Sequence, residues 1–414
     1  MFYRILKLLG GMTTYSAGQW LMVSLLAHLG GPGPVGQLSL ALSLVTPLAV
    51  LSSLSSRMLL QMDPRRDGDL FRDYWHLRLA TTVIFFIVII GIVMWRRDDV
   101  SLTLSILFVT LFRGVENVSD VLCGLAQNRD DQNILSMSLF YRGLGTVVPF
   151  VVVYLATNSL PSALASVAAA WALVAFNDWW RTRAWHGRLM PIAHRQIVGL
   201  ARRSLPIGLS VFLSGFSIVV PRLMLESYEG VEALGIFSAL TYTITLGNLF
   251  VGSISNSMLR NVATYWQDGD TKAFFRVILK SSAVLMGMCA VGITLAAVFG
   301  KWILLVLYGP QFTSYTTLFT GVAIAASFVL LAGLWAYLVI GTNSAYFQLW
   351  SNVAIVAAAL GSSYMLIPRF GIWGAVIVLF VVSATRIALT LANVAYVIRR
   401  DQAPRAQARQ LKSA

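Results

Sequence analysis

Charged side chains are scarce in this sequence, and acidic ones are the scarcest. Only 12% of the 414 residues are charged, with 17 acids against 31 Lys and Arg, while 57% are apolar. The mean hydropathy is +0.74. Because a soluble domain needs far more polar surface than this, the composition excludes a soluble protein and predicts one embedded in a membrane.

Residues that commonly form metal sites or act as nucleophiles are also few. The chain has two cysteines and four histidines, and the histidines show no metal-ligand spacing (His28, His76, His186 and His194). A paired-cysteine motif, a phosphate-binding loop and a nucleophile elbow are all missing. Cys123 and Cys289 fall in or beside apolar stretches, where we expect them to pack rather than to pair. We therefore predict no enzymatic activity, no cofactor and no metal site.

Long apolar stretches account for most of the chain, and there are about twelve of them, each of about 20 residues. Only a helix or a closed barrel satisfies its backbone polar groups within lipid, and the stretches are too long and too uniformly apolar for barrel strands. The first stretch is long and lacks a small-residue cleavage site, so no signal peptide is expected. The predicted spans are 10–29, 35–58, 79–95, 101–122, 134–156, 162–180, 205–224, 235–259, 277–299, 316–340, 347–366 and 372–396.

Lys and Arg are distributed unevenly between the connections of these spans. One side holds only Arg96, Arg97, Lys301 and Arg369, whereas the alternate connections and the C-terminal tail hold most of the others. By the positive-inside rule, both termini are predicted to be cytoplasmic, in the inner (plasma) membrane. This asymmetry accounts for most of the net charge of +14, so we expect no nucleic-acid partner.

The pattern of polar segments between spans occurs twice. Gly36-Gln-Leu-Ser-Leu-Ala-Leu begins one span and Gly235-Ile-Phe-Ser-Ala-Leu-Thr begins another, and an Asp-Gly-Asp segment before Phe-Arg follows each. We infer a duplicated half-chain, with bundles at 1–180 and 205–398, a basic linker at 181–204 and a basic tail at 399–414. Transporters built from such repeats bind substrate where the halves meet. Residues 61–78 and 265–276 mix aromatic and basic side chains, and they predict short helices on the membrane surface.

Ionisable side chains inside apolar spans are costly, and they usually face a cavity or a partner. Arg113, Glu116 and Asp120 are spaced by three and four residues, so they share one helix face. That face forms either a local ion pair or part of a cavity wall. Arg142 has no acid one helical turn away, and its partner is either an acid on another helix, for which Asp178 is the candidate, or the phosphate of a ligand.

The remaining candidates lie in the second half. Arg386 has no local acid, and Arg222 could reach outward or pair with Glu226. Guanidinium groups bind phosphate through paired hydrogen bonds, and amide side chains such as that of Asn248 can bind sugars. The candidate cavity residues are thus Arg142, Arg113, Glu116, Arg386, Arg222, Asp178 and Asn248.

Several short motifs in a characteristic order resemble those of a known superfamily. They are Glu116-Asn-Val-Ser-Asp120, Pro221-Arg222, Leu234-Gly-Ile-Phe-Ser-Ala239, Phe299-Gly300 with Leu307-Tyr-Gly309, and Ile367-Pro-Arg-Phe-Gly-Ile-Trp-Gly-Ala375. The chain resembles, over nearly its whole length, the polysaccharide and oligosaccharidyl-lipid flippases of the multidrug/oligosaccharidyl-lipid/polysaccharide exporter (MOP) superfamily.

The resemblance implies an all-α polytopic membrane protein with two six-helix bundles, related by a parallel repeat, in a V around a central cavity. It implies alternating access, with a saccharide on a polyprenyl (pyro)phosphate as cargo for surface polysaccharide assembly. Other polysaccharide-export proteins are the implied partners, besides the lipid bilayer. A multidrug/cation antiporter of the same superfamily is the alternative. A membrane glycosyltransferase or polymerase is a weaker one, because the connections leave no sizeable aqueous domain.

Overall fold

The computed structural model describes residues 2–64, 68–186, 194–245, 247–248, 251–252, 255, 258, 262, 264–265, 271–341 and 345–413. Within these ranges the chain forms helices joined by short connections, and it contains no strand. The two cysteines are unpaired, as predicted.

The first half of the chain forms an antiparallel array of helices. They are α1 (Phe2–Gly30), α2 (Pro32–Ser53), the short α3 (Ser56–Met62), α4 (Gly68–Arg96), α5 (Val100–Asn128), α6 (Gln132–Thr157) and α7 (Leu160–Thr182). Helix caps mark several of the ends. The Asp99 carboxylate accepts hydrogen bonds from the backbone N–H groups of Ser101 and Leu102 at the start of α5, which satisfies donors that a helix start leaves free.

The second half contains two very long helices that each bend back at a glycine. These two are α8 (His194–Thr241) and α12 (Ala345–Ser413), and α10 (Thr271–Tyr308) and α11 (Thr316–Gly341) lie between them in the chain. The 3₁₀ turns η1 (Arg183–Trp185) and η2 (Pro310–Tyr315) lie in the connections. Gly230 divides α8 and Gly371 divides α12, with φ of 86° and 54°. Only glycine adopts such backbone conformations readily, so each long helix contains two spans.

Within the described residues, eight helices are long and apolar enough to cross a membrane, and two of these are the divided segments Ile197–Thr245 and Phe347–Tyr396. With α1 and α5, which also have the length to cross, the fold has about twelve transmembrane helices, as the sequence predicts. One prediction was wrong. Short surface helices were expected at 61–78 and 265–276, but residues 61–62 end α3, and residues 68–78 and 271–276 are the first turns of α4 and α10. Aromatic side chains of these first turns lie in buried apolar clusters.

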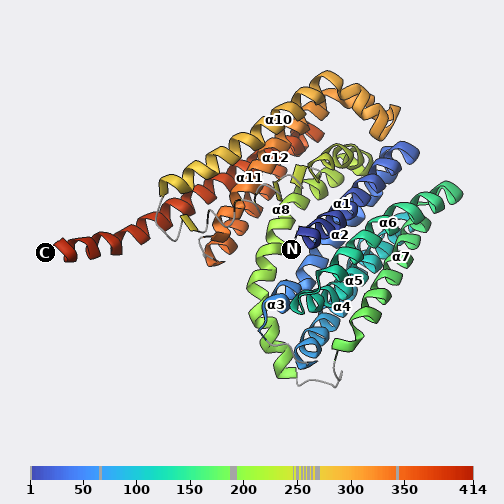
Figure 1. The fold of residues 1–414 in the computed structure, drawn as a ribbon. Helices are drawn as coiled ribbons and strands as arrows, with labels where there is room; N and C mark the ends of the chain where they lie inside the picture. Colours follow the sequence, from blue (N-terminus) through green and yellow to red (C-terminus); the bar gives the residue numbers. More distant parts are fainter. Residues whose placement is uncertain are drawn as a thin grey trace.

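The helices form a V (Figure 1). The group α10–α12 and the group α1–α7 come together at the upper right of the view, and they spread apart towards the side where the C-terminus lies. We call the first of these ends the closed end. It contains Gly31, Gly230 and Gly309, which have positive φ at the connections between helices.

At the closed end, the structure repeats locally between the two halves. Gly31 (φ 74°, ψ −167°) and Gly230 (φ 86°, ψ 178°) have the same unusual conformation, and each begins the next helix. A Cβ added to Gly36 would lie 1.9 Å from the carbonyl oxygen of Val231, and one added to Gly235 would lie 1.9 Å from that of Pro32. These contacts are reciprocal, so α2 and the second arm of α8 (231–241) pack around a pseudo-twofold axis.

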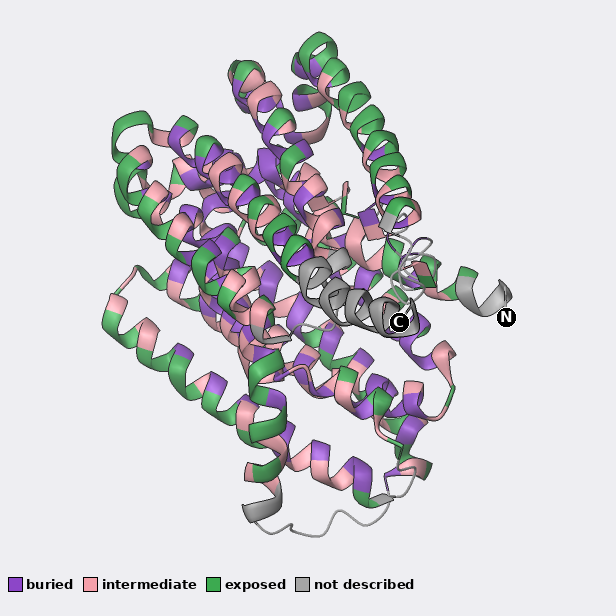
Figure 2. Cartoon of the chain, turned by 90° about the vertical axis from the view of Figure 1, so that its left-hand side faces the viewer, coloured by how far each residue is buried: buried purple, intermediate pink, exposed green. Residues whose placement is uncertain are grey.

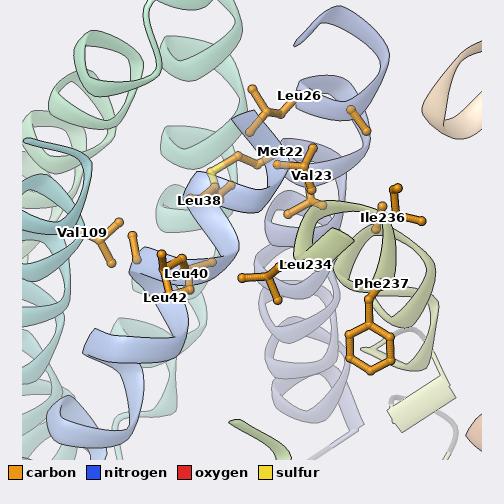
Figure 3. Close-up of a cluster of buried hydrophobic side chains, with 14 of the residues drawn as sticks. Met22, Val23, Leu26, Leu38, Leu40, Leu42, Val109, Leu234, Ile236 and Phe237 are labelled. Carbon is orange, nitrogen blue, oxygen red and sulfur yellow. The ribbon is translucent and has the colours of Figure 1, made fainter. Parts of the chain in front are cut away.

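The buried residues continue across this interface. One apolar cluster includes Met22, Leu38, Leu234, Phe237 and residues of all the large helices. Figure 3 shows Leu234 of α8 pointing towards the part of α2 that carries Leu38 and Leu40. Figure 2 shows buried residues along the inward faces of helices and exposed residues along the outward faces. Many of the exposed side chains are large and apolar, such as Ile84, Ile87, Val152 and Val291, which fits contact with lipid.

Candidate functional site

A cavity of about 210 Å³ lies inside the second half of the chain. Its wall comes from both arms of α8, the segment that follows Thr241, α11 and the second arm of α12. The lining residues are Ser217, Ile218, Arg222, Phe237, Thr241, Ile244, Thr245, Asn248, Val329, Ala332, Leu379, Val382, Ser383 and Arg386. We call this the cationic cavity. Three of the seven candidate residues, Arg222, Arg386 and Asn248, lie in its wall.

The two arginines of the cationic cavity have few protein partners. The Arg386 guanidinium donates only long hydrogen bonds, of 3.5 Å to the carbonyl oxygen of Ser214 and 3.3 Å to the hydroxyl of Ser217. The Arg222 guanidinium lies 6.0 Å from the centre of the Tyr242 ring. Among the residues that the structure describes, no carboxylate lies within 4.0 Å of either guanidinium. Both side chains therefore present donors and positive charge to the cavity.

The pairing of Arg222 with Glu226 that the sequence allowed does not form. The Glu226 carboxylate instead accepts a hydrogen bond of 3.0 Å from Arg96 at the end of α4, and Arg96 also bonds to Asp98. The sequence could not indicate this contact, because it joins helices 130 residues apart. The contact links the two halves of the chain at the closed end.

The other four candidates gather in the first half, between α1, α5, α6 and α7. Arg113 and Glu116 form the predicted pair on one face of α5, with 2.6 Å between Nη1 and Oε2. The Tyr15 hydroxyl of α1 donates a hydrogen bond of 2.6 Å to the other Glu116 oxygen. Asp120, one turn further on, contacts Arg57 of α3 at 3.4 Å. We call this group, together with Arg142 and Asp178, the ionic cluster.

Arg142 lies at the centre of the ionic cluster, and only 2% of it is exposed. Its guanidinium nitrogens lie 3.8 Å from Glu116, 3.9 Å from Asp120 and 3.8 Å from Asp178, so the expected partner Asp178 is present with two further acids. Ser119 relays the contact, because it accepts from Arg142 at 2.5 Å and donates to Asp178 at 2.5 Å. In this conformation, protein acids compensate the charge of Arg142.

Sequence reasoning missed several members of the ionic cluster and its surroundings. From the sequence, Arg57 and Arg78 were placed in a connection between two spans, among the basic residues of the cytoplasmic side. In the structure, however, Arg78 is 1% exposed and donates a hydrogen bond of 2.8 Å to Ser56. Ser138 donates to Asp178 at 2.6 Å. Ser138 lies four residues before Arg142, so both side chains lie on one helix face. This spacing is the sequence signal that could have indicated that both contact the same partner, Asp178.

The chain was compared with known proteins, and the matches cover most of its length. No protein family model matches the sequence. The capsular polysaccharide biosynthesis protein CapF of Staphylococcus aureus is 22% identical over 364 residues, which are 86% of this chain and 90% of CapF.

Among solved structures, an inward-facing MATE family multidrug resistance transporter of the MOP superfamily matches with a TM-score of 0.65 and 13% identity, over 94% of this chain and 96% of that one. A MOP superfamily transporter from Pyrococcus furiosus, described as having a binding pocket of reverse polarity that suggests a different function, matches with a TM-score of 0.57 and 15% identity. That match covers 95% of this chain and 94% of the transporter. The chain has the MOP transporter fold. This fold is the one that the resemblance of the motifs implies, and the long apolar helices show a multi-pass membrane protein.

Within the MOP fold, the seven candidates divide between two chemically different places. The ionic cluster of the first half balances Arg57, Arg113 and Arg142 against Glu116, Asp120 and Asp178, and the cationic cavity of the second half has arginines without acids among its described lining. The described lining of the cavity comes wholly from the second half, although the sequence predicts a site where the halves meet. A role in substrate binding stays a prediction for all seven residues.

Replacing Arg142 with Ala is expected to destabilise the MOP fold by about 3–5 kcal/mol, because removing one partner of a buried ion pair leaves uncompensated charge. Asp178, which is 0% exposed, would lose its cation. The midpoint of thermal unfolding of the purified protein in detergent measures this effect. Arg113→Ala is the matched control and should cost less, because Glu116 keeps its contacts with Tyr15 and Arg142. Normal stability of Arg142→Ala with loss of transport would instead place Arg142 in contact with substrate.

Proposed function

We propose that this protein moves a lipid-linked oligosaccharide, carried on a polyprenyl phosphate or pyrophosphate, from the cytoplasmic to the outer leaflet of the inner membrane. The observation that carries the proposal is the cationic cavity, in which Arg222 and Arg386 lack carboxylate partners among the described residues. An uncompensated cation at membrane depth is costly, so an anionic ligand would stabilise it. A (pyro)phosphate fits, because guanidinium groups bind it with paired hydrogen bonds.

The rest of the cavity wall suits a sugar. Thr241, Thr245, Asn248 and Ser383 add hydroxyl and amide groups beside the two arginines. Sugars need both donors and acceptors, and side-chain amides and hydroxyls supply both. The name of the similar CapF protein, which refers to capsular polysaccharide biosynthesis, supports a saccharide cargo for this chain.

Alternating access is the proposed mechanism. With both termini in the cytoplasm, the closed end faces outward, and the spread of the two groups of helices faces the cytoplasm (Figure 1). Transport then requires the contacts of the closed end to break while the opposite ends approach. Partner proteins of a polysaccharide-export system would supply the lipid-linked cargo and use it after transport.

A multidrug/cation antiporter is the second candidate function. It is favoured by the solved structures with the same fold, several of which are multidrug resistance transporters. Cationic drugs need acids in the binding site, whereas the described wall of the cavity carries arginines. The reverse polarity described for the Pyrococcus furiosus transporter supports the view that this fold also serves other cargo.

Deletion of the gene is expected to cause lipid-linked oligosaccharide to accumulate in the cytoplasmic leaflet. The pool is extracted and quantified, and its sidedness is measured with a membrane-impermeant reagent that oxidises sugars. The native gene should relieve the accumulation, and a variant with Arg222→Gln and Arg386→Gln should not. An unchanged pool together with increased drug sensitivity would contradict the proposal and favour the antiporter.

A further inference from the structure

A second cavity, of about 240 Å³, lies between α10, α11 and the segment that follows the second arm of α8. Its lining residues are Thr243, Gly247, Leu285, Met288, Cys289, Gly292, Ile293, Ala296, Ile303, Phe319, Ala323, Ala326, Ser327 and Leu330. We call it the apolar cavity. Met288 and Gly292 are exposed on the outward face of α10, so the cavity is accessible from the side that contacts lipid.

The chemistry of the apolar cavity excludes a polar ligand. No charged side chain is among its described lining residues. The hydroxyls of Thr243 and Ser327 donate to carbonyl oxygens of their own helices, those of Leu240 and Ile324, so they are not free to donate to a ligand. An apolar cavity of about 150 Å³ is enough to hold benzene, and the larger volume here accommodates a branched hydrocarbon segment.

The apolar cavity and the cationic cavity lie on opposite faces of the same two helical segments. After the second arm of α8, Thr241, Thr245 and Asn248 face the cationic cavity, while Thr243 and Gly247 face the apolar one. On α11, Val329 and Ala332 face the first, and Ala323, Ala326, Ser327 and Leu330 face the second. These spacings place the two sets of residues on opposite faces of each helix, so a wall one helix thick separates the cationic cavity from the apolar cavity.

Gly247 and Leu330 lie against each other where the two helical segments of this wall meet. A Cβ added to Gly247 would lie only 2.6 Å from the Leu330 side chain, so Leu330 fills the space that Gly247 leaves. Leucine changes rotamer without moving the backbone. A rotation of Leu330 would therefore open space beside Gly247, between that segment and α11.

We propose that the apolar cavity binds the polyprenyl chain of the lipid-linked substrate while the phosphate lies in the cationic cavity, and that the chain passes between Gly247 and Leu330. The inference rests on the proposed function. The positive charge of the neighbouring cationic cavity favours a polyprenyl chain over other hydrocarbon ligands. A single amphiphile with an anionic head and a hydrocarbon chain would fill both cavities at once.

Cys289 is a native reporter of occupancy, because it lines the apolar cavity and the other cysteine, Cys123, is 0% exposed. In full-length protein carrying Cys123→Ser, the rate of reaction of Cys289 with N-ethylmaleimide is measured in nanodiscs. Undecaprenyl diphosphate at about ten times its dissociation constant should slow the reaction about tenfold. Inorganic pyrophosphate, which has no hydrocarbon chain, should leave the rate unchanged.

A pair of glycine variants tests the site independently. A Cβ at Gly292 or at Gly287 meets no atom within 4 Å, so a leucine fits at both, and only Gly292 lines the apolar cavity. Gly292→Leu should fill the cavity and weaken binding of radiolabelled undecaprenyl diphosphate about tenfold or more. Gly287→Leu on the same helix should bind like the native protein.

The outcomes separate the two proposals. If undecaprenyl diphosphate binds but neither protects Cys289 nor responds to Gly292→Leu, the inference is overturned and the proposed function stands. If Cys289 is already fully protected in nanodiscs without the polyprenyl compound, and reactive in detergent, a phospholipid chain fills the cavity and the inference is overturned. If undecaprenyl diphosphate does not bind even to the native protein, the proposed function fails with it.

Discussion

Replacement of Arg386 by Gln is expected to reduce transport of the lipid-linked oligosaccharide about 10- to 100-fold, and Arg222→Gln should have an effect of the same size. A hydrogen bond to a charged group is worth about 1.5–3 kcal/mol, and in the proposed function each guanidinium would supply such bonds to the phosphate. Both side chains line the cationic cavity, and no described carboxylate compensates them there. Transport in reconstituted vesicles and relief of the accumulated pool in deleted cells are the two measurements.

Lys301→Gln is the matched control. It removes one positive charge from the second half, at an exposed position outside the described lining of the cavity, and it should transport normally. Arg386→Lys keeps the charge but loses the paired geometry of the guanidinium, so its activity should fall between native and Arg386→Gln. Native transport by both Gln variants at equal protein levels would contradict a phosphate site in this cavity. Increased efflux of a cationic drug by these variants would favour the antiporter.

A disulfide between Ser39→Cys and Ser238→Cys is expected to abolish transport until it is reduced. The two hydroxyl oxygens lie 2.5 Å apart across the pseudo-twofold axis, and a disulfide joins sulfurs about 2.05 Å apart. The bond would hold α2 against the second arm of α8, beside the close contacts of Gly36 and Gly235. If the closed end must separate in each cycle, oxidation should lower transport at least about tenfold, and a reductant should restore it.

The variant is made with Cys123→Ser and Cys289→Ser, so that only the engineered pair can react. The control pair is Ser159→Cys with Ser162→Cys, whose hydroxyls lie 3.2 Å apart at the start of α7 within one half. This disulfide should leave transport unchanged, because it joins two residues of the same half and so does not restrict movement between the halves. Full transport by the oxidised Ser39→Cys/Ser238→Cys protein would show that the closed end does not open, and alternating access about this interface would be wrong.

Local patterns explain which predictions succeeded. The length and apolarity of each stretch were enough to predict a membrane-spanning helix, because lipid forces each span to satisfy its own backbone hydrogen bonds. The repeated glycine-headed segments predicted the duplication, and the structure shows the matching conformations of Gly31 and Gly230. The pair of Arg113 with Glu116 followed from a spacing of three residues on one helix.

The contacts of Arg142 mark the limit of such reasoning. Its helix provides no acid within one turn, and the sequence left open whether a protein acid or a ligand phosphate is its partner. The folded chain brings Glu116 and Asp120 of α5 and Asp178 of α7 around it, with Ser119 between Arg142 and Asp178. Arg386 likewise has no acid within one turn, and Arg222 has Glu226 four residues on, yet no described carboxylate approaches either guanidinium.

The amino-acid sequence thus specified the membrane environment, the approximate number of spans, the repeated segments and the fold, because these depend on hydrophobicity and spacing along the chain. The assignment of each buried charge depended on helix packing, since an ion pair between helices joins residues that are far apart in sequence and close in space. The same holds for the two cavities. Neighbouring residues such as Thr245 and Gly247 line different cavities, because helical geometry directs them to opposite sides of one wall.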